Sequence, residues 1–356
     1  MNTIIQPGST IGIVGGGQLG KMLCIAAAEL GYKTCVYSDQ ENSCAFDVAT
    51  TPVFVRDYAN ERELLNFVNV VDVITLEFEN IPLEIIDRLG SMRNGKIKVF
   101  PGREALRVSQ DRRLEKELAR SLGIDTPKFW VIETTVDLEQ EITYPVILKT
   151  ARNGYDGKGQ KHIRDKVELA AAWEMFERVP CVAEEVVNFL YEFSIILVRK
   201  ENGETNSFPL FENTHSKGIL AKTNWPLQKM TQKEDEHVSL IAKKIAAKLE
   251  VVGLLAVEMF YTQENKILFN EIAPRPHNSG HVTLDCAVTS QFEQHIRAVC
   301  NLPLGNMGVK VPGRMENIIG DFDLLPMAWS DRNAKVHLYG KSARAGRKLG
   351  HITYIG

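Results

Sequence analysis

The sequence has only six cysteines, and they follow no pattern that binds zinc or builds a disulfide framework. They are scattered, without a CxxC pair and without a Cys/His cluster at zinc spacing. We therefore expect reduced thiols in a cytoplasmic protein. At least Cys24 and Cys300 are predicted to pack in the core.

Long apolar runs are also missing. The longest, residues 251–260, includes Glu258 and is far shorter than the ~20 residues of a membrane-spanning helix. Residues 1–10 have no basic residue and no long apolar core, so we expect no targeting signal there. With a net charge of −3, the sequence lacks the basic excess that predicts nucleic-acid binding, although local basic clusters can hold smaller anions. It contains no internal repeat and no low-complexity tract.

The composition is that of a soluble globular protein, with 44% hydrophobic and 24% charged residues. At ~150 residues per domain, 356 residues predict two or three domains. Residues 10–14 predict a strand, residues 15–20 a tight turn, residues 21–30 a helix and residues 33–37 a second strand. This βαβ unit predicts a three-layer α/β domain that ends near Pro101.

The rest of the chain alternates between strand and helix patterns. Helices are predicted over residues 109–122, 167–176 and 236–249, strands over residues 145–149, 181–187 and 192–198, and short strands and turns after residue 301.

Two glycine-rich turns compete as nucleotide-binding motifs. The first, residues 15–20 (GGGQLG), follows a strand and opens a helix, and Asp39 lies near the place of a ribose-binding acid in dinucleotide-binding enzymes. However, the unpaired N–H groups of such a turn hold any phosphate. The motif alone leaves a dinucleotide, another phosphate or no ligand open.

The second turn, residues 152–160 (RNGYDGKGQ), carries more charge. Its glycines allow the backbone to close over phosphates, while Lys158 and Lys149 supply positive charge. The alternative, a flexible surface hairpin, leaves Lys149 unexplained, because a lysine that ends an apolar strand needs an anion. Residues 184–187 (EEVV) then end a strand where backbone groups can meet an adenine edge, and Glu192 can bind ribose hydroxyls. Acids after a strand are also commonly just solvated.

A β-hairpin is predicted in the second half of the chain, with two carboxylates on one face. Pairing Tyr261 with Lys266 sets Glu258 opposite Phe269, and Glu271 then lies diagonally on the same face. Two adjacent acids repel each other unless a cation lies between them, and Mg²⁺ takes one or two carboxylates beside phosphate and water. The alternative is that one or both glutamates lie on a solvated face.

The loop after this hairpin, residues 273–281 (APRPHNSGH), is dense in polar groups. It offers one guanidinium, two imidazoles, an amide and a hydroxyl within seven residues. A solvated loop rarely needs this density, so the loop favours a binding site at the end of the hairpin.

The order of these motifs resembles the ATP-grasp ligases, in which two α+β lobes clamp ATP and paired acids on a late hairpin hold Mg²⁺. More narrowly, the motifs resemble the 5-(carboxyamino)imidazole ribonucleotide synthetase family. The resemblance spans nearly the whole chain and rests on residues 15–20, 77–80 (EFEN), 154–160, 273–281 and 338–341 (LYGK). It implies a mixed α/β and α+β fold with an N-terminal Rossmann-like pre-ATP-grasp domain (residues 1–101), an ATP-grasp domain (102–300, lid subdomain about 120–187) and a small C-terminal β-rich subdomain (301–356).

The implied activity is ATP- and bicarbonate-dependent carboxylation of 5-aminoimidazole ribonucleotide to 5-(carboxyamino)imidazole ribonucleotide in purine biosynthesis. ATP phosphorylates bicarbonate to carboxyphosphate, and the exocyclic amine captures this intermediate, or CO2 released from it. ATP is the implied co-substrate and Mg²⁺, or alternatively Mn²⁺, the implied metal. The implied assembly is a cytoplasmic homodimer without nucleic-acid or membrane partners.

The resemblance also implies roles for individual residues. Glu258 and Glu271 hold the metal, Asp156 acts on the amine proton, and Tyr155 packs on the imidazole. Arg275 and Asn278 together hold bicarbonate or carboxyphosphate. Lys158, which lies in the lid, is a further catalytic residue. The ATP-binding residues are Arg112, Lys149, Gly154, Tyr155, Asp156, Gly157, Lys158, Gly159, Gln160, Glu184, Glu185, Val186, Val187, Glu192, His215, Asn270 and Glu271. The ribonucleotide, with its phosphate at the first glycine turn, is bound by Gly17, Gln18, Leu19, Glu77, Glu79, Tyr155, Asn278, Ser279, Lys341, Arg347 and Lys348.

The sequence departs from the family pattern in two places. Asn153 stands where relatives usually have a glycine, which predicts a stiffer lid and altered turnover, and the chain ends at Gly356, which predicts that a final helix is absent. The alternatives are another ATP-grasp carboxylase or ligase, an NAD-dependent oxidoreductase and a regulatory nucleotide-binding protein without turnover. A biotin carboxylase needs a carrier, for which the sequence has no Met-Lys-Met motif, and the oxidoreductase leaves the acidic hairpin without a purpose.

Overall fold

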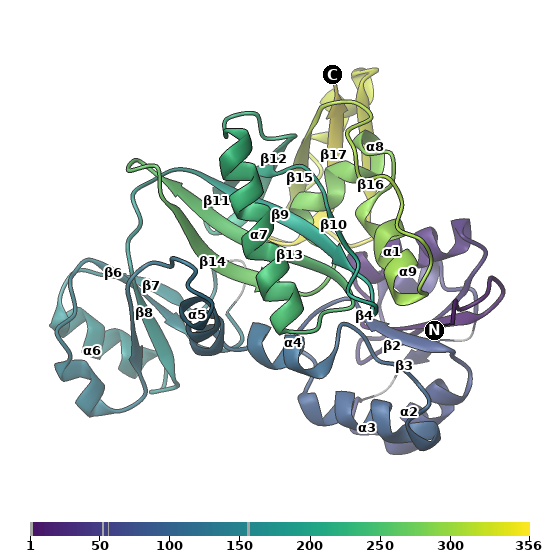
Figure 1. The fold of residues 1–356 in the computed structure, drawn as a ribbon, viewed down its shortest axis with the longest axis horizontal. Coiled ribbons are helices and arrows are strands. Elements are labelled where there is room, and N and C mark those ends of the chain that lie inside the picture. The colour runs from purple at the N-terminus through teal and green to yellow at the C-terminus, as the bar shows by residue number, and fades with distance from the viewer. Residues whose placement is uncertain (1–2, 52, 56, 155–156) are drawn as a thin grey trace.

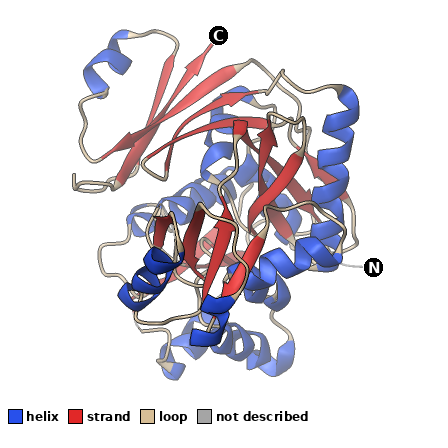
Figure 2. Ribbon diagram, turned by 90° about the vertical axis from the view of Figure 1, so that its left-hand side faces the viewer, coloured by secondary structure: helices blue, strands red, loops and turns tan. Residues whose placement is uncertain are grey.

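A computed structural model describes residues 3–51, 53–55, 57–154 and 157–356 of the chain. Within these residues, three β-sheets and the helices around them form the molecule (Figure 1). Figure 2 shows the longest strands gathered in one large curved sheet, with helices packed along it.

The N-terminal sheet is parallel, with strand order β3-β2-β1-β4 among the described residues. β1 is followed by a tight turn and α1 and pairs in parallel with β2, so the predicted βαβ unit is confirmed, although α1 begins three residues earlier than expected. The apolar strands are buried on both faces, as in other parallel sheets. The elements of this layer are β1 (Thr10–Val14), α1 (Gln18–Glu29), β2 (Lys33–Ser38), η1 (Cys44–Asp47), β3 (Phe54–Val55), α2 (Glu61–Asn69), β4 (Val73–Leu76) and α3 (Leu83–Gly95).

Two short helices, α4 (Arg103–Ser109) and α5 (Arg112–Ser121), connect this layer to the rest. The prediction of one helix over residues 109–122 was wrong at its start, and α4 was not predicted. The chain breaks between the two helices because Asp111 is extended and caps α5, with its carboxylate accepting a hydrogen bond from the Arg113 N–H.

The second sheet is antiparallel and four-stranded, in the order β5-β8-β6-β7. It forms the lobe on the left of Figure 1 and has a small core of its own, in which Leu148 and Trp173 are buried. Its elements are β5 (Phe129–Ile132), η2 (Thr135–Glu139), β6 (Val146–Thr150), β7 (Gln160–Ile163), α6 (Lys166–Met175) and β8 (Cys181–Glu185).

The largest sheet has nine strands among the described residues and runs in the order β14-β13-β9-β11-β12-β15-β17-β16, with β10 paired to β9. The last three strands of the chain therefore extend the sheet that carries the acidic hairpin. Its strands are β9 (Phe189–Arg199), β10 (Thr205–Ser207), β11 (Phe211–Ser216), β12 (Ile219–Trp225), β13 (Gly253–Thr262), β14 (Ile267–Ala273), β15 (Gly313–Ile319), β16 (Ala334–Leu338) and β17 (Lys348–Ile355). The associated helices are α7 (Gln232–Lys248), η3 (Asn278–Val282), α8 (Thr283–Cys286), α9 (Gln291–Val299) and α10 (Leu325–Ser330).

One hydrophobic cluster joins distant parts of the chain. Ile11 and Leu23 of the N-terminal layer pack with Phe292 and Ile296 of α9 and with Tyr339 near the end of the chain. All six cysteines lie within the described residues, form no disulfide and are buried, which confirms the predicted core positions of Cys24 and Cys300. The parallel layer and the large sheet thus share a core.

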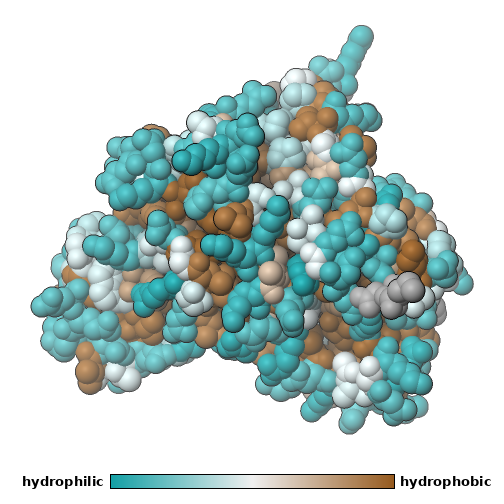
Figure 3. Space-filling model, viewed as in Figure 1, coloured by the Kyte–Doolittle hydropathy of each residue, from teal (hydrophilic) through white to brown (hydrophobic). Residues whose placement is uncertain are grey.

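The face of the molecule shown in Figure 3 is mostly hydrophilic. In the view of Figure 3, apolar side chains occur in small groups separated by polar ones, as on ordinary globular proteins. Among the described helices, none has the length and apolar character needed to cross a bilayer.

Candidate active site

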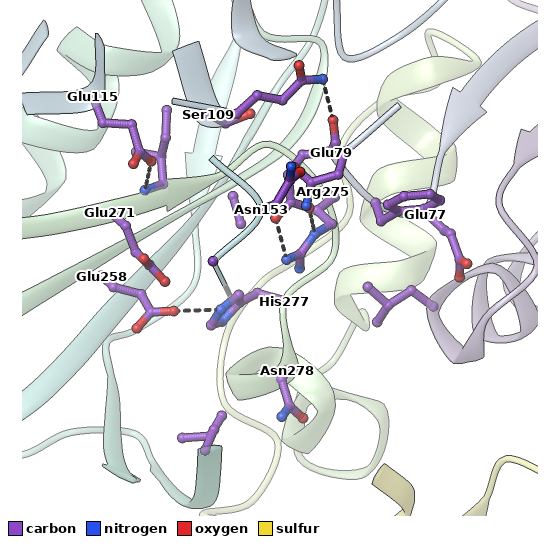
Figure 4. Close-up of a pocket in the computed structure, with 18 of the residues that line it drawn as sticks. Glu77, Glu79, Ser109, Glu115, Asn153, Glu258, Glu271, Arg275, His277 and Asn278 are labelled. Atoms are coloured by element: carbon purple, nitrogen blue, oxygen red, sulfur yellow. Dashed lines mark hydrogen bonds and ion pairs between the residues drawn. The ribbon is translucent and has the colours of Figure 1, made fainter. Parts of the chain in front are cut away.

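A cavity of about 560 Å³ lies where the three sheets approach one another. Figure 4 shows its polar side chains converging from several elements. Its lining includes Glu77 and Glu79 after β4, Arg112 and Glu115 of α5, Asn153 and Gly154 of the lid turn, His215 of β11, Glu258 of β13, Glu271 of β14, Arg275, His277 and Asn278 of the following loop, and Lys348 of β17.

The two hairpin carboxylates face each other directly. The predicted register was wrong, because Tyr261 pairs with Ile267 rather than with Lys266. A bulge then shifts the pairing between Met259 and Glu258, so that Glu258 lies opposite Glu271 and not opposite Phe269. Direct opposition brings the two side chains closer than the diagonal arrangement expected from the sequence.

Each of these carboxylates contacts a basic side chain. Glu258 Oε1 lies 2.8 Å from His277 Nε2, and Glu271 Oε2 accepts a hydrogen bond of 2.7 Å from Arg112 Nη1. Burial raises the pKa of Glu258, but His277, His215 and Arg275 together lower it to about 2. Glu258 is therefore ionised at neutral pH.

The donor set suits a hard divalent cation. Asn270 Oδ1, beside the carboxylate pair, is buried without a hydrogen-bond partner. The described residues contain no cluster of three or more His, Cys, Asp or Glu side chains that could hold a metal. Mg²⁺ does not need one, because it commonly takes one or two carboxylates and completes its shell with phosphate and water. Glu258 and Glu271 fit that requirement.

Two lysines converge on one buried carboxylate next to the cavity. Glu184 Oε2 at the end of β8 lies 3.0 Å from Lys149 Nζ and 3.2 Å from Lys116 Nζ. Burial raises the pKa of Glu184, but the two ammonium groups lower it to about 2. The anion that the sequence required for Lys149 is, in this structure, Glu184. Glu185, Val186 and Val187 follow at the exposed end of the strand.

Glu192 and His215, both predicted to bind ATP, are brought together by neighbouring strands. His215 Nδ1 lies 2.6 Å from Glu192 Oε2. Burial lowers the pKa of His215, but Glu192 and Glu258 raise it above the usual value for histidine. The pair presents a charged edge to the cavity, which His215 lines.

Arg275 and Glu79 were assigned to different substrates but bind each other. Arg275 donates through Nε and Nη2 to the two carboxylate oxygens of Glu79, and its Nη1 donates to the Pro276 carbonyl at 3.1 Å. The guanidinium group of Arg275 is thus already hydrogen-bonded to a carboxylate, and this contact holds the loop after β14 against the N-terminal layer.

Asn278 and Ser279 have different surroundings. Both side-chain polar atoms of Asn278 are buried and have no hydrogen-bond partner among the described residues, although the residue lines the cavity. An unpaired buried amide is costly, so this one is suited to a ligand. Ser279 Oγ instead lies 2.8 Å from Ser194 Oγ and 2.8 Å from His277 Nδ1, and it lines neither cavity described here.

The first glycine turn already holds an anion of the chain itself. The Glu77 carboxylate accepts hydrogen bonds from the N–H groups of Gly17 and of Gly20, the latter at 2.7 Å. Burial raises the pKa of Glu77 despite these two donors. A dinucleotide pyrophosphate at this turn would compete with Glu77, which argues against the oxidoreductase interpretation.

Beside this turn lies a second cavity of about 1100 Å³. Lys341 and Arg347 line this cavity from the C-terminal part, and Lys341 Nζ donates to Gln18 Oε1, whereas Lys348 lines the first cavity. Sequence reasoning missed Ser38 and Ser43, which also line it. Their position after β2, at the carboxyl edge of a parallel sheet, was the available signal.

The lid turn is described on both sides of Tyr155 and Asp156, which themselves lie outside the described residues. Asn153 has a φ of 61°, a left-handed conformation that asparagine tolerates better than most residues, so it can replace the glycine usual in relatives. Gly157 and Gly159 also have positive φ, and Lys158 and Gln160 are exposed.

Three family models match the chain in sequence order. They are the ribonucleotide synthetase preATP-grasp domain (residues 8–110), the ATP-grasp domain (residues 117–292) and the phosphoribosylaminoimidazole carboxylase C-terminal domain (residues 314–356). These matches confirm the expected fold class, an ATP-grasp fold with an N-terminal pre-ATP-grasp domain and a C-terminal domain.

Full-length relatives and solved structures agree. The N5-carboxyaminoimidazole ribonucleotide synthase of Bacillus subtilis (strain 168) is 41% identical over 99% of this chain and 93% of its own length. An ADP complex of N5-carboxyaminoimidazole ribonucleotide synthetase superposes with a TM-score of 0.93 at 39% identity, covering 100% of this chain and 94% of that chain. The Aspergillus clavatus N5-carboxyaminoimidazole synthase in complex with ADP and 5-aminoimidazole ribonucleotide gives a TM-score of 0.88 at 28% identity, covering 98% and 94%.

Proposed function

The chain belongs to the N5-carboxyaminoimidazole ribonucleotide synthase family, and we propose how its residues divide the work of that reaction. It is an ATP-dependent carbon–nitrogen ligase that carboxylates 5-aminoimidazole ribonucleotide in purine biosynthesis. The observation that carries the assignment is the facing pair Glu258 and Glu271 beside the unpartnered amide of Asn278, in a cavity bounded by all three parts of the chain.

We assign ATP to the side of the cavity between the lid sheet and the large sheet. The backbone of residues 185–187 meets the adenine, Glu192 and His215 bind the ribose, and Lys149 and Arg112 bind phosphates. Lys149 and Arg112 are partly buried and now paired with carboxylates, so a phosphate would replace one anion by another. Glu258 and Glu271 would hold Mg²⁺, with Mn²⁺ as an alternative. The cation neutralises phosphate charge when bound.

In the first step, a bicarbonate oxygen attacks the γ-phosphorus of ATP while the bond to the ADP oxygen breaks, which gives carboxyphosphate. We place bicarbonate at Asn278, because its amide offers both a donor and an acceptor that have no partner among the described residues. Arg275 contributes positive charge to this end of the cavity from its fixed position on Glu79. Glu79 thus orients Arg275 rather than binding ribose.

In the second step, the exocyclic amine attacks the carboxyl carbon of carboxyphosphate, or CO2 released from it, and inorganic phosphate leaves. We place the ribonucleotide phosphate in the second cavity, between Lys341, Arg347, Ser38 and Ser43. Glu77 lines both cavities and lies where the ribose would pass between them. The amine proton goes to Asp156, and Tyr155 packs on the imidazole; both assignments rest on the family resemblance.

The test is ADP release from Mg-ATP and bicarbonate, measured with and without 5-aminoimidazole ribonucleotide. We expect strong stimulation by the ribonucleotide and, with ¹⁸O-labelled bicarbonate, one labelled oxygen in the released phosphate. ATP turnover that ignores the ribonucleotide would refute the substrate assignment, and unlabelled phosphate would refute carboxyphosphate. NAD reduction, assayed in parallel, should be absent.

We further propose a division into a substrate-phosphate domain (residues 1–101), an ATP-grasp domain (102–300) with a lid (about 120–187), and a C-terminal subdomain (301–356). We also propose a cytoplasmic homodimer, as the family resemblance implies. Light scattering should give twice the chain mass of 40.0 kDa. A mass of one chain at micromolar concentration would refute the dimer.

A further inference from the structure

Helix α5 presents three charged residues on one face. Arg112, Glu115 and Lys116 are spaced i, i+3 and i+4, so they share the side of the helix that packs against β14. Glu115 and Lys116 are only 3% and 1% exposed. Burying adjacent charges is expensive, and apolar residues of similar size would pack at least as well. Stability alone therefore does not explain this face.

The partner of this face is an edge strand. Among the strands of the described residues, β14 is the last in the large sheet, so no strand there pairs with the backbone groups on its outer side. Glu115 Oε1 accepts a hydrogen bond of 3.0 Å from the Ile272 N–H, and Lys116 Nζ donates one of 2.9 Å to the Asn270 carbonyl. These two backbone groups flank Glu271 on either side. Figure 4 shows the Glu115 contact next to the Glu258 and Glu271 carboxylates.

The same stretch of β14 contains the bulge. Met259 pairs with Phe269, but Glu258 pairs with Glu271, so Asn270 is an extra residue in the strand. Side chains alternate between faces along a strand, and a slip of one residue would turn Glu271 away from Glu258. The groups that hold the backbone on both sides of Glu271 therefore decide where its carboxylate points.

We propose that Glu115 and Lys116 are positioning residues, which fix the bulged backbone of β14 so that Glu271 stays opposite Glu258 as a ligand for a divalent cation. This inference rests on the proposed metal role of the two carboxylates. Lys116 Nζ also lies 3.2 Å from Glu184 Oε2, which binds Lys149 of the lid sheet. We call the contacts of Glu115 and Lys116 with β14 the clamp. The clamp thus connects Glu271, the proposed metal ligand, to Lys149, the lysine assigned to ATP phosphate.

The test separates the reach of residue 115 from its charge. Glu115→Gln keeps an acceptor oxygen at the same distance and removes the charge, whereas Glu115→Asp keeps the charge and is too short to reach the Ile272 N–H. The measurement is the binding of Mn²⁺ in the presence of ADP, which is monitored by electron paramagnetic resonance. We expect the dissociation constant of Glu115→Gln to stay within about twofold of wild type and that of Glu115→Asp to rise about tenfold or more, the range found for residues that orient metal ligands.

Two variants serve as controls. Leu118→Ala removes a buried side chain from the same helix without touching β14 polar groups, and it should lower the melting temperature but leave Mn²⁺ binding unchanged. Glu271→Gln tests the metal role itself. If Glu271→Gln binds Mn²⁺ like wild type, the proposed metal site fails. If only Glu271→Gln is impaired, the metal site stands and the clamp is refuted.

The remaining outcomes are also decisive. Equal weakening by Gln and Asp, or weakening by Gln alone, would mean that charge matters and the acceptor position does not, and would overturn the proposal. The proposal would also be overturned if Leu118→Ala bound Mn²⁺ as weakly as Glu115→Asp. Should Glu115→Asp not fold, hydrogen exchange supplies the test. The Ile272 amide should be strongly protected in wild type and in Glu115→Gln, and rapid exchange in the wild type would overturn the clamp.

Discussion

His295 lies fully buried between the N-terminal sheet and the large sheet. Its Nδ1 accepts a hydrogen bond from the Leu254 N–H at 3.3 Å, so Nε2 carries the proton and donates to Thr75 Oγ1 at 2.7 Å. Burial lowers the pKa of His295 to about 3. The neutral imidazole therefore connects α9 to β13 and β4, and protonation breaks this arrangement.

This residue should make stability depend on pH. Above pH 6.5, the imidazole is neutral in both folded and unfolded chains, and its contribution to stability is fully present. As the pH falls below 6.5, only the unfolded chain takes up the proton, so the free energy of unfolding should drop by about 1.4 kcal/mol per pH unit until the folded-state pKa is approached. Urea denaturation between pH 7.5 and 5 measures this slope.

The same measurement on a variant isolates His295 from other buried histidines. His295→Gln should reduce the dependence of the unfolding free energy on pH by one bound proton. Burial also lowers the pKa of His281 and His351, and both remain in this variant. An unchanged slope in His295→Gln would contradict the prediction.

Among the elements, the lid turn touches the β11–β12 turn through a pair of glycines. Gly218 has a φ of 77°, and a Cβ there would lie 2.7 Å from the Gly157 Cα. A Cβ at Gly157 would lie 3.0 Å from the Lys217 carbonyl oxygen. The backbones of the two turns are therefore in direct contact at the cavity, and there is no room for a side chain between them.

Gly218→Ala should prevent this approach. We expect kcat/KM for formation of the carboxylated product to fall about tenfold or more, because an open lid exposes the acyl phosphate intermediate to water. Steady-state kinetics measures the effect. Gly203→Ala is the matched control: Gly203 has a φ of 88° in the β9–β10 turn, and a Cβ there would meet nothing closer than 3.9 Å. Both variants carry similar backbone strain, so equal kinetics would refute the contact.

The sequence predicts these elements better than it predicts their register. Alternating apolar residues reveal the acidic hairpin, but the extra residue Asn270 leaves no mark in the pattern, because a bulge depends on contacts with α5. Likewise, the glycine turn is visible in the sequence, whereas the carboxylate of Glu77 that fills it comes from 60 residues away. Asp111 was readable as a helix cap and was overlooked.

At the scale of the whole molecule, the cluster around Phe292 should make the N-terminal layer and the large sheet unfold together, because both contribute residues to it. Phe292→Ala should cost about 3–5 kcal/mol, because it leaves a cavity between α9 and the N-terminal layer. Hydrogen exchange in mild urea should then speed up together in peptides from β1 and β13. Trp173→Ala, in the separate core of the lid sheet, should speed up exchange in β6 and β8 only. Faster exchange in β1 alone after Phe292→Ala would contradict the shared core.

The order of the domains can be predicted from motifs spaced along the chain. The contacts between the domains cannot be predicted from these motifs. The ion pair between Glu79 and Arg275 and the packing of α9 on α1 involve residues about 200 to 270 positions apart. No local pattern encodes such a contact, since either partner alone is compatible with an exposed position. These contacts between distant parts of the chain form both cavities, so the site depends on the tertiary fold.

The shared core also bears on synthesis by the ribosome. Residues of β1 and α1 leave the ribosome before the residues that complete their cluster, which are Phe292, Ile296 and finally Tyr339. At ~5–20 residues per second, the ~200 residues between Pro101 and α9 take about 10–40 s to make. During that interval the nascent N-terminal layer exposes an apolar face, so we expect it to need a chaperone until α9 has been made.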